Sequence, residues 1–166
     1  FVSDKVFLAL AAASVDGKRP LHLVAVTAGS APSGEGAEMV VLSIDPVTLQ
    51  LSQQASTPLA GVTQVADIVG GNYDENPTDD EIVVVTAGAA IDSTVASLYA
   101  FGGNPLSATL LNTATVPSVL PVDKIDAASG IVHPLSNDVN TIVVDAEHLG
   151  AAAVMTVFTI EHDRFV

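Results

Sequence analysis

The sequence contains no cysteine and no tryptophan, and aromatic residues make up only 4% of it. The absence of cysteine excludes disulfides, thiol nucleophiles and thiolate metal sites. The shortage of aromatic rings argues against a cleft that stacks on sugars, and favours thin, tightly packed layers over a large aromatic pocket.

Basic residues are also scarce, with five Lys and Arg against nineteen Asp and Glu, and the formal net charge is -14. Such a charge repels phosphate backbones and anionic lipid surfaces, so nucleic acid is a poor candidate partner. Apolar runs are short as well, because Asp, Gly, Pro or Asn interrupts each one before about 18 residues. We therefore expect no membrane insertion.

Small and branched apolar residues are abundant. Hydrophobic residues account for 49% of the 166 positions and charged residues for 14%, which is unlike a disordered chain. The apolar residues are mainly Ala, Val, Leu and Ile, a composition that suits strands. The length fits one domain or a few small repeats.

A repeat of about 59 residues organises the chain. Three similar apolar strings, "LHLVAVTAG", "EIVVVTAG" and "NTIVVDAEH", place Val26, Val85 and Val144 at intervals of 59 residues. Later runs end at Ile44, Phe101 and Ile160, which are 57 and 59 residues apart. We expect three repeats, with the boundaries 1–59, 60–118 and 119–166.

Each repeat divides into four short strands, so the predicted fold class is all-β with four-stranded antiparallel, blade-like repeats. The second strands are continuously apolar, which predicts burial on both faces. The fourth strands, at 49–56 and 108–115, alternate with polar residues and should be half exposed. The third repeat ends before its fourth strand is complete. The first strands are expected at 6–11, 65–69 and 124–128.

The segment "GGNYDENPTDD", at 70–80, concentrates oxygen-bearing side chains. They fall at every second residue, a spacing that suits a calcium loop, and the proposed ligands are Asn72, Asp74, Asn76, Thr78 and Asp80. The alternative is an Asx-rich surface turn without an ion. The second repeat carries seven acids and no base, a charge density that is unfavourable unless water solvates it or a cation neutralises it, so both readings stay open.

The stretch "VADIVGGNYDENPTDDEIVVV", at 65–85, resembles the FG-GAP/VCBS repeat of integrin-like β-propellers, and residues 8–26 and 125–144 are weaker copies. The resemblance implies that each repeat is one propeller blade. It also implies acids at the first, third, fifth and ninth loop positions. Asp74 and Asp80 match two of these, Asn72 and Asn76 are neutral, and Glu81 competes with Asp80 for the ninth.

Three blades do not close a ring, so the outermost faces need a partner. Leaving an apolar face of about 400 Å² in water costs on the order of 10 kcal/mol at about 25 cal/mol per Å². We expect the partner to be further copies of the chain, the remainder of a larger chain, or a strand added to the incomplete third sheet.

Other chemistry has little support. The histidines at 22, 133, 148 and 162 are scattered, and the acids near His148 and His162 are typical of solvated strand ends rather than of a transition-metal site. No nucleophile elbow, phosphate-binding glycine loop or zinc-protease helix occurs. A hydrolase with two carboxylates from distant strands is the catalytic alternative.

The sequence thus predicts a non-catalytic structural or adhesive β-repeat module that works outside the cell or at its surface. It would assemble into an oligomer or filament, or form part of a larger propeller, with one optional Ca²⁺ ion. A propeller fragment that binds a ligand or glycan is the second hypothesis, and a hydrolase domain is the third.

Overall fold

The structure is a computed structural model of the chain. The residues it describes are 6–16, 22–27, 36–60, 62, 65–73, 79–86, 94–116, 124–130, 141–147 and 154–166.

These residues form β-strands and turns, as the composition predicts, and they contain no helix that is long and apolar enough to cross a membrane. In chain order the strands are β1 (Phe7–Ala13), β2 (His22–Thr27), β3 (Glu38–Ile44), β4 (Leu51–Pro58), β5 (Asp67–Gly71), β6 (Glu81–Thr86), β7 (Val95–Gly102), β8 (Ser107–Thr115), β9 (Lys124–Gly130), β10 (Thr141–Glu147), β11 (Val154–Glu161) and β12 (Arg164–Phe165).

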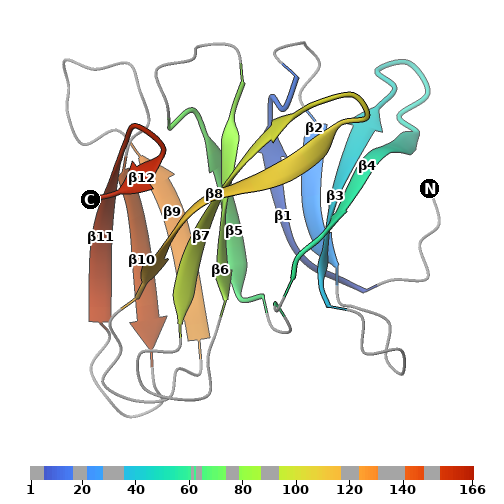
Figure 1. The fold of residues 1–166 in the computed structure, drawn as a ribbon. Coiled ribbons are helices and arrows are strands. Elements are labelled where there is room, and N and C mark those ends of the chain that lie inside the picture. The colour runs from blue at the N-terminus through green and yellow to red at the C-terminus, as the bar shows by residue number, and fades with distance from the viewer. Residues whose placement is uncertain are drawn as a thin grey trace.

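Consecutive strands pair antiparallel and build three separate four-stranded sheets. The orders are β1-β2-β3-β4, β5-β6-β7-β8 and β12-β11-β10-β9. The sheets follow one another across the molecule, with the N-terminal sheet at one side and the C-terminal sheet at the other (Figure 1). This order confirms the all-β prediction and the division of each repeat into four strands.

The central strands form the core because they are apolar on both faces. In β6 the residues from Ile82 to Val85 are fully buried, and in β7 so are Ala96 and Leu98. The outer strands β4 and β8 are half exposed, as predicted: exposed positions are interspersed with partly buried ones, and Ala55 in β4 is buried. The location of the core therefore follows from the sequence, since β-branched side chains occupy the central strands and polar side chains occupy the outer strands.

The fourth strand of the last sheet is very short. β12 pairs with β11 only at Ile160 and Glu161, whereas β8 runs beside the whole length of β7. A two-residue turn joins β11 to β12, and both of its residues, His162 and Asp163, have positive φ angles of 49° and 62°. These angles belong to the type I′ hairpin turn, which matches the twist of paired strands. The incomplete fourth strand is as predicted.

The pairing between strands shows which residues of the first two sheets are equivalent, and these residues are separated by the intervals that the repeat predicts. Val26 lies opposite Met39, and Val85 lies opposite Ala96, so these two pairs occupy matching places. In the third sheet, however, Val144 lies opposite Ala127 and Thr156, as Val84 lies opposite Ile68 and Ser97. The match predicted for Val144 is therefore wrong by one position.

That shift is confined to β10. In β9 and β11 the interval of 59 residues holds, because Asp126 and Met155 flank Asp145 as Asp67 and Ala96 flank Val85. One extra residue thus lies between β9 and β10 and is compensated between β10 and β11. This one-residue shift was not visible in the sequence, because neighbouring positions of β10 carry similar apolar residues.

Two buried clusters join the three sheets. The first lies between the first and second sheets, and includes Val24, Val26 and Met39 with Ile82 and Phe101. The second lies between the second and third sheets, and includes Val83, Val85 and Leu98 with Phe158 and Ile160. The second sheet is thus covered on both faces, while each end sheet has one face that neither cluster covers.

Candidate functional site: the inter-sheet contacts and the two outer faces

A carboxylate at the start of β5 ties the second sheet to the third. Asp67 Oδ2 accepts a hydrogen bond of 2.8 Å from the backbone N–H of Ala127 in β9. Asp67 Oδ1 accepts another of 2.8 Å from the N–H of Ile68. An ionised acceptor makes the stronger kind of hydrogen bond, and here it satisfies an N–H on the edge of a neighbouring sheet.

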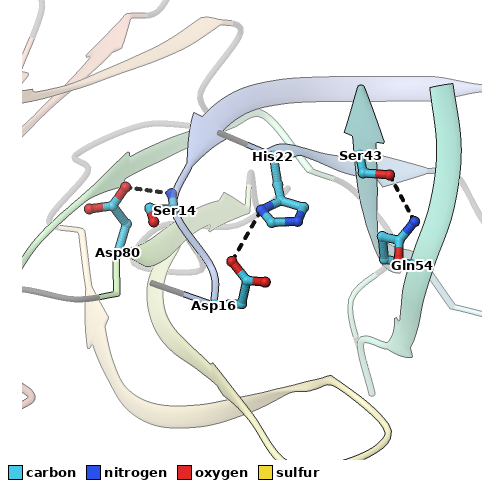
Figure 2. Close-up of polar contacts among 6 residues, drawn as sticks. All are labelled: Ser14, Asp16, His22, Ser43, Gln54 and Asp80. Atoms are coloured by element: carbon cyan, nitrogen blue, oxygen red, sulfur yellow. Dashed lines mark hydrogen bonds and ion pairs between the residues drawn. The ribbon is translucent and has the colours of Figure 1, made fainter. Parts of the chain in front are cut away.

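The first and second sheets are tied in a similar way near the acidic loop. The backbone N–H of Ser14, just after β1, donates to Asp80 Oδ2 at 2.6 Å, and the N–H of Asp80 donates to the carbonyl of Ser14 at 2.7 Å. Figure 2 shows the Asp80 carboxylate directed toward Ser14. Two chain segments that lie 66 residues apart are thus paired through one residue on each side.

The outer strands carry two further ties. Thr57 Oγ1 in β4 accepts from the N–H of Ala108 in β8 at 2.9 Å, and Asn112 Oδ1 in β8 accepts from the N–H of Phe165 in β12 at 3.2 Å. In both, a side chain of the earlier sheet accepts a backbone N–H of the next sheet. Neighbouring sheets therefore meet with like strands beside like strands, at the inner and the outer edge.

A glycine allows the inner strands to approach. A Cβ built on Gly70 in β5 would lie 2.8 Å from the carbonyl oxygen of Ala12 in β1 and 3.2 Å from Cδ1 of Ile82. The first distance is shorter than real Cβ atoms show and is to a backbone atom, and the second is tight, so glycine fits here without a shift of β1. The "GG" of the acidic segment therefore serves the packing between sheets.

Two of the five proposed calcium ligands lie within the described residues. Asn72 follows β5 and Asp80 precedes β6, and both are partly buried. Asp74, Asn76 and Thr78 lie outside the described residues. The neighbouring Glu81 is buried, and its Oε2 accepts a 2.7 Å hydrogen bond from the N–H of Tyr73. Asp80 and Glu81 thus both accept backbone N–H groups, a role that the sequence analysis did not assign to either residue.

The histidines within the described part of the chain do not converge. His22 Nδ1 lies 3.9 Å from Asp16 Oδ1, beyond hydrogen-bonding distance (Figure 2). His162 is exposed in the β11–β12 turn, as predicted for a solvated strand end. Among the described residues, no three His, Cys, Asp or Glu side chains are grouped to hold a metal ion. His133 and His148 lie outside the described residues.

The outer face of the third sheet exposes two large apolar side chains of β11. Met155 is 68% exposed and Val157 is 57% exposed. Their equivalents by strand pairing are Ala96 and Leu98 in the second sheet, and both of those are fully buried against the third sheet. The same positions in the first sheet are Met39 and Val41, which are buried against the second. These positions are thus buried wherever another sheet follows.

The opposite outer face, on the first sheet, is open along β1. Leu10 lies opposite Ala25 and is 57% exposed, whereas Ile68, its equivalent opposite Val84, is only 3% exposed. Ala25 itself is buried, so the open part of this face is β1 rather than the centre of the sheet. Each end of the molecule therefore shows a surface that is covered at the equivalent place inside it.

The chain matches no protein-family model and no curated protein sequence. The resemblance to FG-GAP/VCBS repeats therefore stays a prediction from residues 65–85.

The sequence predicted that the end faces would need a partner, but the side chains that form hydrogen bonds between the sheets were not identifiable from it. Asp67, Thr57 and Asn112 were missed as acceptors between sheets. Asp67 was visible only as an acid at the start of an apolar strand. Thr57 and Asn112 looked like ordinary polar positions of half-exposed strands.

Proposed function

We propose that the chain is a non-catalytic structural module, whose two outer sheet faces are completed by further sheets of the same kind. The observation that carries the proposal is the contrast in burial between equivalent residues. Val157 is exposed, whereas Leu98 and Val41 at the same place in the other two sheets are buried. An apolar position that is covered in each internal copy is expected to be covered at the ends too.

In this proposal the sheets act as blades of an incomplete propeller or of an open array, in line with the resemblance of residues 65–85. Adjacent inner strands, such as β1 beside β5 and β5 beside β9, support that arrangement. The proposed setting is outside the cell or at its surface, as an adhesive or scaffolding part. No catalytic group is part of the proposed mechanism, which is face packing and edge pairing.

The test is sedimentation velocity over a range of protein concentrations. We expect the chain to form larger species as the concentration rises, and the variant Met155→Asp/Val157→Asp to lose them. Val47→Asp is the matched control, since Val47 is 88% exposed in the β3–β4 turn, away from both faces. A species of 16.8 kDa at every concentration would contradict the proposal.

A further inference from the structure

The two outer faces of this chain correspond to the two sides of its internal contacts. At each internal contact, the earlier sheet contributes the positions of Met39 and Val41 or of Ala96 and Leu98. The later sheet contributes the other face, which includes Ile68 in the second sheet and Ala127 in the third. The exposed residues Met155 and Val157 are of the first kind.

Leu10 is of the second kind. Leu10 in β1, Ile68 in β5 and Ala127 in β9 occupy equivalent positions. They pair with Ala25, Val84 and Val144, the equivalent residues of the second strands.

The third sheet therefore presents, at Met155 and Val157, the kind of face that an earlier sheet contributes to an internal contact. The first sheet presents the kind of face that a later sheet contributes, and this face is open along β1 at Leu10, while Ala25 and Val40 beside it are buried. Two copies of the chain supply the missing faces to each other only when they meet end to end in the same direction.

We infer that the occupant of the outer face of the third sheet is the first sheet of a second copy, docked head to tail. This inference rests on the proposed function. In the junction, β9 of one copy lies beside β1 of the next, as β1 lies beside β5 and β5 beside β9 within the chain. The contact is heterologous, so it produces a ring or a filament according to the rotation between copies.

Two single substitutions separate the two sides of this junction. Val157→Asp blocks the outer face of the third sheet, and Leu10→Asp blocks the outer face of the first. Both residues are 57% exposed, so neither change introduces a charge into the folded core. Circular dichroism and the urea midpoint of each variant check that the fold is retained.

The experiment is a mixing test by light scattering during size exclusion. Each variant alone is expected to be a monomer of 16.8 kDa, because every possible junction has one blocked side. An equimolar mixture is expected to give a species of twice that mass and nothing larger. Only one junction is possible in the mixture, between the open third sheet of Leu10→Asp and the open first sheet of Val157→Asp.

Different failures have different meanings. A dimer of Leu10→Asp alone would show that third-sheet faces pair with each other, and a dimer of Val157→Asp alone would show the same for first-sheet faces. Either result overturns the head-to-tail inference while leaving the proposed function intact, as does a mixture that stays monomeric although the unchanged chain assembles. A monomeric unchanged chain overturns the proposed function itself.

Discussion

At the scale of single residues, Gly70 sets the closest approach between the first two sheets. We predict that Gly70→Ala destabilises the fold by about 1–3 kcal/mol, because the added methyl group meets the carbonyl oxygen of Ala12 and the buried side chain of Ile82. Gly102→Ala is the matched control, since a Cβ there would meet no atom within 4 Å. Urea unfolding of both variants is the measurement. Equal losses of stability would show that the contact at Ala12 is unimportant.

The hydrogen bond from Ala127 to Asp67 leads to a second prediction for a single residue. Asp67→Ala leaves the N–H of Ala127 without its acceptor, so we expect a loss of about 1–3 kcal/mol in the free energy of unfolding. Asp67→Asn retains one carbonyl acceptor and should lose less. Hydrogen exchange at Ala127 is the specific readout, and its amide should exchange faster in the alanine variant. Unchanged protection of that amide would contradict the role of Asp67.

At the scale of elements, the acidic segment between β5 and β6 has one observed role in joining the sheets and one predicted role in binding calcium. Its ends hold the sheets, through Gly70 before the loop and Asp80 after it. Its acids are also the basis for the predicted calcium site. These two roles are compatible, because a carboxylate that accepts one N–H keeps further lone pairs for a cation.

Calcium binding is therefore best measured as the change in melting temperature on adding Ca²⁺, because substitutions at Asp80 also change the stability of the ion-free protein. We predict that millimolar Ca²⁺ raises the melting temperature of the unchanged chain and does not raise that of Asp74→Ala/Asp80→Ala. The acid-to-alanine changes remove two of the five proposed ligands. Asp45→Ala, in the exposed β3–β4 turn, is the control that should keep the calcium response. A calcium response that survives the double change would move the site elsewhere, and no response in any chain would make the segment a plain turn.

The elements themselves were largely predictable from the sequence. Strands β6 and β8 begin within one residue of the predicted positions, because runs of Val and Ile and polar alternation are strong local signals. The first strands were less accurate, and β5 spans Asp67–Gly71 rather than 65–69. Glycines usually mark strand ends, but Gly70 lies within this strand, where β1 packs closely against it.

The contacts between sheets were not predictable from the sequence, because they join residues such as Ser14 and Asp80 that are distant in the chain and become close only in the fold. The displaced pairing of Val144 has the same origin. A one-residue shift moves a strand by one register position, and neighbouring valines leave no trace of it in the apolar pattern.

At the scale of the whole molecule, the net charge opposes the proposed assembly through apolar faces. The net charge is -14, and in the third sheet Asp145 of β10 pairs with Asp126 of β9 on one side and with Met155 of β11 on the other. Copies of such a chain repel one another at low ionic strength. Salt shortens the range of this repulsion to about 10 Å at about 0.1 M.

We therefore predict that association strengthens when the ionic strength is raised from about 10 mM to about 150 mM. Asp145→Val should strengthen it further, because this position is Val85 in the second sheet, where the side chain is buried. Sedimentation at both ionic strengths measures the effect. Association that weakens with salt would mean that charge attraction, rather than apolar packing, holds the copies together.

In the proposed assembly, the outer face of the third sheet becomes covered. Since the chain has no tryptophan, Val157→Trp places a single fluorescent reporter on that face. Its emission is expected to shift to shorter wavelength as the protein concentration rises, while Val47→Trp in the β3–β4 turn keeps the emission of a solvent-exposed ring. Emission from position 157 that stays solvent-exposed at every concentration would contradict the account.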